Sequence, residues 1–293
     1  MKLINICKEV NYLTIILFLY VLGGHNAAAA QERSTNLFTK APKDVYLGAI
    51  MTIQSINKPV HEFVAAEPMT MRVSTSSNTW ENLSFELNSS RKDLQKKMEE
   101  RYKPTSQNLS FSYAIEEITD YNRLSLYFGQ LVDVKKWFKI PAGESETNKV
   151  MIHLEQILFT LDLDMMDPQK QVDAVKNKEL NVDSLIIINS LLFGKKAVVL
   201  VESNQPTTVI RSILQSEIQG RELTPQQKSI MSTFTFRVAV FGTKKEIAFD
   251  NDKPLSNVLN FFNTSTDFLP DPLSFSAVYI KDNSVFENEY AIK

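Results

Sequence analysis

Residues 148–164 have the sequence NKVMIHLEQILFTLDLD. In the first half of this stretch apolar residues alternate with other residues, which is the period of a β-strand with one buried face: Val150, Ile152 and Leu154. In the second half the apolar positions move by one residue, to Ile157, Phe159, Leu161 and Leu163. A one-residue shift turns every later side chain to the other face, so the pattern predicts a bulge or bend near Gln156.

A second alternating run lies just upstream, between residues 132 and 140. Its apolar positions, which Lys136 interrupts, are Val132, Val134, Phe138 and Ile140. The segment between the two runs, PAGESETN at residues 141–148, has the composition of a turn. Together they predict a long amphipathic β-hairpin, and an ordinary surface hairpin explains the same pattern.

The stretch KVMIHLEQILFTLDLD resembles the strand that ends the first membrane-spanning segment of the cholesterol-dependent cytolysins. Other stretches resemble further segments of that family in the same order: DVYLGAI (44–50), RKDLQKKMEERY (91–102), LIIINSLLFGKKAVVLVE (185–202), FTFRVAVFGT (234–243) and SFSAVYIKDNSV (274–285). The resemblance covers about residues 42–293. It implies an α+β fold in which two helical clusters flank a bent central antiparallel β-sheet of about four strands.

Two departures from the family are visible. The sequence ends soon after KDNSVFENEY, where the family begins its C-terminal cholesterol-binding β-sandwich, and its only tryptophans are Trp80 and Trp137. The resemblance is therefore to the short component of two-component cytolysin-like proteins, which lacks that domain. The family's strand glycine pair is reduced to Gly242 and Thr243. We expect Gly242, and Gly194 between two buried-type strands at 185–188 and 197–201, to be hinge positions of the sheet.

The N-terminal region has the features of a secretory signal. Residues 1–30 combine two early lysines, an apolar run from Leu13 to Leu22 and four alanines, which predicts cleavage before Gln31. Residues 31–43 are expected to form a flexible arm, and residues 44–293 the cytolysin-like core. The single cysteine, Cys7, leaves with the signal, so disulfides and thiol catalysis are excluded for the mature chain. The net charge of −2 gives no indication of a nucleic-acid partner.

The resemblance implies two membrane-inserting segments, at about residues 129–156 and 206–229. The first contains the two alternating runs described above. The second fits a helix, because Ile210, Ile213, Leu214 and Ile218 form one apolar stripe. It also fits a strand, because an uncharged face alternates with Arg211, Gln215 and Glu217: Ile210, Ser212, Leu214, Ser216 and Ile218. A helix that becomes a membrane hairpin needs this double compatibility.

Two aromatic residues are expected to matter for assembly. In the resembling family, aromatics near Tyr121 and Phe236 stack between neighbouring subunits and set the strand register. An offset aromatic pair adds about 0.5–1.5 kcal/mol beyond burial, which is enough to bias register when it is repeated around a ring. The alternative is that both residues are ordinary core aromatics.

Catalytic and metal-binding patterns are weak. His61-Glu62 lacks the second histidine of an HExxH zinc site, and His153 lies within the predicted strand. Asp162, Asp164 and Asp167 could bind a cation, but their spacing lacks the glycine and terminal glutamate of an EF-hand loop, so a solvated strand edge explains them as well. The sequence therefore predicts neither an enzyme nor a cofactor.

The resemblance implies a secreted pore-forming subunit. It would join copies of itself and a long cytolysin-like component with a membrane-binding domain, then insert hairpins into target-cell membrane lipid as a β-barrel. Lys136, Pro141 and Pro225 favour an alternative, a decoy subunit that joins the complex without inserting. An unrelated secreted protein that binds surface glycans is the remaining alternative.

Overall fold

The structure, a computed structural model, describes residues 31–34, 37–38, 44–77, 80, 82–103, 110–124, 133–141, 147–164, 166–242, 254–263 and 269–291. The chain divides into two units, residues 1–32 with 291–293 and residues 33–290. The predicted signal lies outside the described residues. β1 (Gln31–Ser34) and β11 (Asn288–Ala291) are not part of the large sheet that organises residues 33–290.

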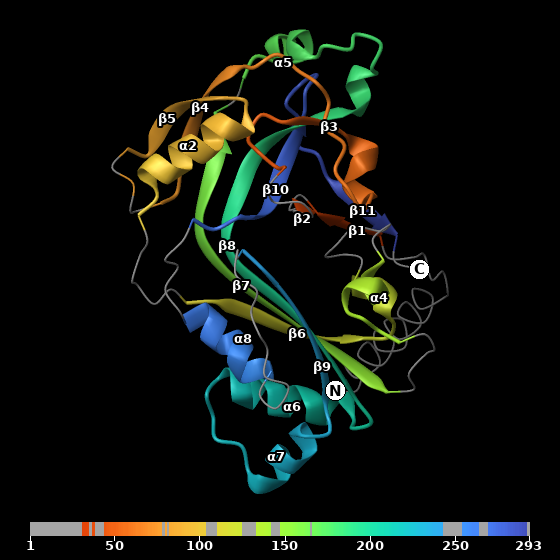
Figure 1. Cartoon of the computed structure of the whole chain (residues 1–293). Coiled ribbons are helices and arrows are strands. Elements are labelled where there is room, and N and C mark those ends of the chain that lie inside the picture. The colour runs from red at the N-terminus through yellow and green to blue at the C-terminus, as the bar shows by residue number, and fades with distance from the viewer. Residues whose placement is uncertain are drawn as a thin grey trace, which may run out of the picture. The chain divides into compact units, whose positions relative to one another are not determined.

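The centre of residues 33–290 is an antiparallel sheet, shown in Figure 1. In the described residues it has nine strands, and its main path is β2 (Leu37–Phe38), β10 (Pro272–Tyr279), β8 (Leu185–Ser203), β7 (Asn148–Leu163), β4 (Thr70–Thr75) and β5 (Ser84–Asn88). Three more strands pair with β8 or β7: β3 (Ile50–Thr52), β6 (Ser112–Ile118) and β9 (Thr235–Phe241). The predicted α+β class and antiparallel sheet are confirmed. The sheet exceeds four strands because β7 and β8 are long enough to pair with different strands at their two ends.

The predicted bend in residues 148–164 is confirmed. The register between β7 and β8 shifts between Ile157 and Phe159, and Ile157 pairs with Gly194 at this point. β8 is a single strand of 19 residues, so the prediction of two strands joined around Gly194 was wrong. Glycine is typical of turns. Gly194 instead lies at the bulge of a continuous strand, where the lack of a side chain permits a neighbouring backbone to approach closely.

One end of β7 and β8 belongs to the largest apolar core. There α2 (Arg91–Arg101) packs over β4 and β5, with Leu94 and Met98 buried. The side chain of Ser90 accepts a hydrogen bond from Asp93 N at 3.2 Å and so caps the start of α2. This end also carries η1 (Ile53–Asn57), α5 (Pro168–Ala174) and η3 (Val182–Ser184).

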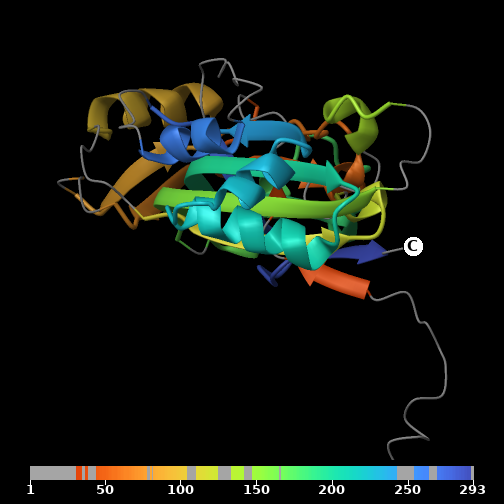
Figure 2. The ribbon, with the colours of Figure 1, turned by 90° about the horizontal axis from the view of Figure 1, so that it is seen from below.

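The other end of β7 and β8 carries helices on both faces (Figures 1 and 2). α6 (Thr207–Ile218), α7 (Pro225–Met231) and α8 (Pro254–Asn263) cover one face. The other face carries η2 (Tyr121–Leu124) and α4 (Val134–Trp137). Within the described residues, every helix is too short or too polar to cross a membrane.

Candidate functional site

The candidate site is the part of the sheet between these helices, called here the four-strand section. It consists of β6, residues 148–155 of β7, residues 196–203 of β8, and β9. β6 pairs with β7 from Ser112–Glu155 to Ile118–Lys149, and β9 pairs with β8 from Lys196–Phe241 to Glu202–Thr235. Among the described residues, β6 and β9 each pair on one side only, so they form the two edges of the section.

Apart from α8, the helices on this section lie in two chain segments that each join neighbouring antiparallel strands. Residues 119–147 connect β6 to β7, and residues 204–234 connect β8 to β9. We call η2 together with residues 133–141 the first cluster, and α6 together with α7 the second cluster. Each cluster thus occupies the position that a turn has in a β-hairpin.

The second cluster buries the apolar stripe predicted from the sequence. Ile210, Ile213, Leu214 and Ile218 of α6 are at most 9% exposed. They pack in one core with the inward side chains of β7 and β8: Val150, Ile152, Leu154, Ala197, Val199 and Val201. α6 ends before Gly220, whose φ of +67° is the left-handed conformation that glycine adopts readily at a helix end. The sequence pattern therefore located the helix and its packing face.

The first predicted segment is helical in this structure, as the resemblance implies for the closed form. Residues 134–137 form α4, so the strand that the alternation alone predicts at 132–140 is wrong for this form; Val132 lies outside the described residues. Val134 and Phe138 are four residues apart and share one helix face, and both are buried against Met151, Val198 and Leu200. The Asp133 side chain accepts from Lys136 N at 3.0 Å and caps this turn. Ile140 is partly buried beside it.

The downstream half of the first predicted segment is already a strand. Val150, Ile152 and Leu154 are fully buried, and β7 pairs with β6 on one side and with β8 on the other. The residues that would have to change conformation in an insertion therefore lie upstream of Asn148.

The structure does not bring Tyr121 and Phe236 together. Tyr121 is 5% exposed in the first cluster, and its hydroxyl donates a hydrogen bond to Glu202 Oε1. Burial, and then this hydrogen bond, raise the pKa of Tyr121. Phe236 lies on the opposite face, among the residues of the second cluster, with its ring centroid 6.1 Å from that of Phe234. Their expected role between subunits stays a prediction.

The two predicted hinge glycines are in contact with each other. A Cβ on Gly194 would overlap the carbonyl oxygen of Gln156, and a Cβ on Gly242 would overlap the carbonyl oxygen of Gly194. Gly242 also has a φ of +81°, which disfavours any other residue. The end of β9 therefore meets the bend of β7 and β8 through backbone atoms.

Charged side chains lie on the face of the sheet that the first cluster covers. Lys196 Nζ is 3.9 Å from Glu155 Oε1, and the two side chains are 8% and 16% exposed. Burial lowers the pKa of Lys196, and Glu155 partly offsets this effect. Burial, with a contribution from Lys196, lowers the pKa of His153 to about 4. His153 is therefore neutral at physiological pH.

The aspartates considered for a cation have other partners. Asp162 accepts hydrogen bonds from Ser190 at 2.6 Å and from Thr160 at 2.8 Å. Asp164 lies 3.6 Å from Arg72 Nε, and Asp167 caps α5. No cluster of three or more His, Cys, Asp or Glu side chains suited to a metal occurs in the described part of the chain.

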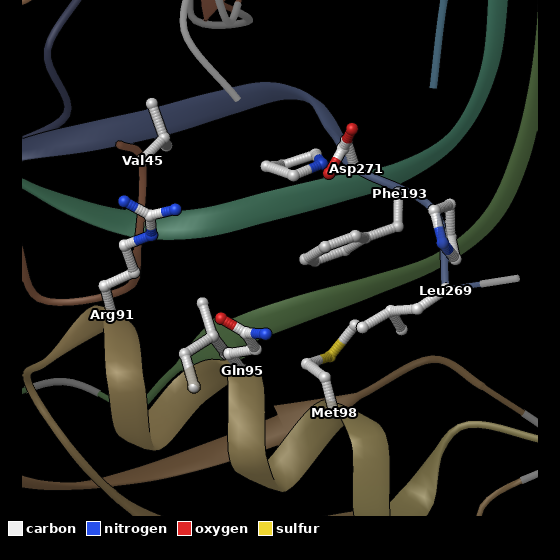
Figure 3. Close-up of a pocket in the computed structure, with 10 residues that line it drawn as sticks. Val45, Arg91, Gln95, Met98, Phe193, Leu269 and Asp271 are labelled. Atoms are coloured by element: carbon white, nitrogen blue, oxygen red, sulfur yellow. The ribbon is translucent and has the colours of Figure 1, made fainter. Parts of the chain in front are cut away.

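A cavity of about 300 Å³ lies beside the bend, outside the four-strand section. Figure 3 shows that side chains from α2 and from residues 269–272 surround it together with Phe193. Its polar lining residues are Arg91, Gln95 and Asp271, and the remainder are apolar. Its volume is at the lower end of the range for small-molecule sites.

No family model and no curated protein sequence matches the chain. Solved structures do. A non-haemolytic pneumolysin from Streptococcus pneumoniae matches with a TM-score of 0.69 and 14% identity over 88% of this chain and 62% of that one. Listeriolysin O matches at 0.73 and 15%, over 88% and 60%. The human-specific toxin intermedilysin matches at 0.65 and 13%, over 88% and 62%.

These neighbours are cholesterol-dependent cytolysins, so the resemblance found in the sequence is confirmed at the level of the fold. The chain spans about three fifths of the length of these toxins. At this level of identity the likeness establishes a shared fold.

Three charged residues that hold helices on the sheet were not predicted from the sequence. Lys195 is 2% exposed and donates from Nζ to the carbonyl oxygen of Phe261 in α8 at 2.8 Å. Glu202 and Arg237 are joined at 3.0 Å and contact the first cluster. Their only signal in the sequence is a charge inside an otherwise apolar strand, in GKKAVVLVE and FRVAVF.

Proposed function

We propose that this chain is a pore-forming subunit of the cytolysin type. The observation that carries the proposal is the position of the two clusters, each between two neighbouring antiparallel strands of one sheet. If residues 119–147 and 204–234 became extended, they would lengthen β6 with β7 and β8 with β9 as two hairpins. The strand order would not change.

Physical constraints favour this conversion over insertion as helices. In lipid every backbone N–H and C=O needs a partner, and closed barrels of strands meet that need. A membrane-spanning strand requires about 9–11 residues, so each connecting segment is long enough for two strands and a turn. In the monomer the apolar side chains of α6 are covered by the sheet, which keeps them from water until the segment leaves.

In this proposal the chain is secreted and acts with a partner. The partner is a long cytolysin-like component that carries the membrane-binding domain, as the resemblance to the short component implies. Copies of this chain would pair through the edges formed by β6 and β9, because among the described residues each of these strands pairs with another strand on one side only.

The test is a leakage experiment with a reversible tether. Gln219 at the end of α6 donates to the hydroxyl of Tyr113 in β6 at 2.9 Å, so cysteines at these two positions can be joined by a short, cleavable thiol cross-linker. The cysteine-free mature chain makes this labelling specific. We expect dye release from liposomes only with a competent long component, complexes without release while the tether is intact, and release after cleavage.

Each single-cysteine variant, treated in the same way, is the matched control and should release dye throughout. Full leakage with the tether intact would contradict insertion of the second cluster. Complexes that form with wild-type chain but never release dye would instead support the decoy subunit.

A further inference from the structure

Three elements meet at Glu202, close to the end of β8. Both carboxylate oxygens are used: Oε1 accepts from the hydroxyl of Tyr121 in η2, and Oε2 accepts from Nε of Arg237 in β9 at 3.0 Å. The side chain of Glu202 is only 7% exposed, and that of Arg237 is 21% exposed. A buried carboxylate is stable when it is paired and hydrogen-bonded in this way.

The other end of the Arg237 guanidinium reaches the first cluster. Nη1 donates to the carbonyl oxygen of Lys139 at 3.0 Å and to that of Phe138 at 3.4 Å. These carbonyls follow the last turn of α4, where a helix leaves acceptors without partners inside the helix. Lys139 has a φ of +51°, a left-handed conformation that a non-glycine residue adopts only when its surroundings hold it. Arg237 therefore caps the end of the cluster.

Glu202 and Arg237 are on paired strands, so they stay neighbours whether or not the cluster is present. Leu200 is opposite Arg237, and Glu202 is opposite Thr235. Among the contacts that Glu202 and Arg237 make in the described residues, release of the first cluster would break those to Tyr121, Phe138 and Lys139 and would leave the carboxylate and guanidinium paired with each other. Lys149 of β7 lies 5.3 Å from the centroid of the Tyr121 ring and adds to the attachment of the cluster, whereas Lys135, at 5.4 Å, belongs to the cluster itself.

We infer that Glu202 and Arg237 form a preassembled latch that holds the first cluster closed on the sheet, with the Tyr121 hydroxyl and the carbonyls of Phe138 and Lys139 as its releasable contacts. The inference rests on the proposed function for its biological meaning, since opening of this latch would free the first segment. It also gives Tyr121 a role in the monomer, where this residue keeps the first cluster in place, in addition to the contact between subunits expected from the sequence.

The test measures opening of the monomer in solution, without membrane or partner. A single cysteine replaces Val134, which is 6% exposed in the first cluster, or Ile210, which is fully buried in the second. The rate at which a thiol reagent labels each cysteine reports how often that cluster opens. Because hydrogen bonds to charged groups are the stronger ones, Tyr121→Phe should raise labelling at position 134 about tenfold or more. Labelling at position 210 should stay within about twofold.

Tyr113→Phe is the matched control. It also removes a tyrosine hydroxyl from the four-strand section, but this hydroxyl accepts a hydrogen bond from Gln219, at the end of α6. It should leave labelling at position 134 unchanged. Glu202→Gln should act like Tyr121→Phe, and the double variant should add little, since both changes break the same contact. Unchanged labelling at position 134 in both variants, or equal increases at positions 134 and 210, would overturn the latch. If the labelling results support the latch but the chain never causes leakage, the proposed function is contradicted and the latch is not.

Discussion

Gly242 packs against Gly194 so closely that a Cβ on Gly242 would overlap the carbonyl oxygen of Gly194. Gly194 in turn leaves no room for a Cβ beside the carbonyl oxygen of Gln156. Backbone atoms cannot rotate aside as the end of a side chain can, so the bend requires glycine at both positions. The end of β9 is thereby fixed at the point where β7 and β8 change register.

The first prediction compares alanine at two glycines. Gly194→Ala should destabilise the chain by about 3 kcal/mol, because the new methyl group forces two paired strands apart. Gly220→Ala is the control, since nothing lies within 4 Å of an added Cβ there and the cost comes from its φ of +67° alone. That change should cost only about 1–2 kcal/mol. Urea unfolding measures both, and equal losses would show that the contact with Gln156 does not constrain the bend.

The second prediction concerns Leu214, which is fully buried between α6 and the sheet. Leu214→Ala should lower the free energy of unfolding by about 2–5 kcal/mol, because it leaves a cavity in the core. If the second cluster inserts, the same change should speed dye release with a partner, since much of the lost packing belongs to the closed form. Arg211→Ala, at an exposed position of the same helix, is the control. Unchanged stability and unchanged release would argue against insertion of residues 206–229.

The third prediction is a pH dependence from His153. Its pKa is lowered to about 4 in the folded chain, so between about pH 6.5 and 4 the unfolded chain binds a proton that the folded chain does not. The stability that depends on neutral His153 is therefore complete above pH 6.5 and is lost as the pH falls towards 4. From pH 7 to 5 the loss should be about 2 kcal/mol.

His153→Gln is the matched variant for this measurement. Other acids titrate in both proteins, so the difference between their urea-unfolding curves isolates the histidine. The variant should lose about 2 kcal/mol less than the wild type between pH 7 and 5. Parallel losses in the two proteins would show that His153 is accessible to protonation in the folded chain.

Structural features that depend on residues close together in the sequence were predicted well. The apolar stripe from Ile210 to Ile218 predicted α6 and its packing face, and the phase change near Gln156 predicted the bend. The strand prediction for residues 134–140 failed because Val134 and Phe138 suit a helix face as well as a strand face. In a short segment the sheet beneath decides between the two, and the sequence does not show which residues that sheet contributes.

The latch and the buried lysine could not be predicted for a different reason. Tyr121, Glu202 and Arg237 come from separate elements, and only the strand register places them side by side. Lys195 reaches the carbonyl oxygen of a residue in α8 that is far along the chain. A charge inside an apolar strand indicates that some partner exists, but the partner follows from the fold.

The last prediction tests whether α6 becomes a strand, and it depends on two adjacent residues. In the helix Ile213 is 1% exposed and Ser212 is exposed. In a strand, period-2 alternation places Ser212 with Ile210 and Leu214 on the lipid side and Ile213 with Arg211 on the water side. An environment-sensitive dye on a single cysteine at position 212 should therefore move from water to lipid on pore formation, while the same dye at position 213 moves from an apolar site to water. If both dyes kept the environments they have in the monomer, α6 would remain a helix in the assembled complex, and the second inserting segment would have to lie elsewhere.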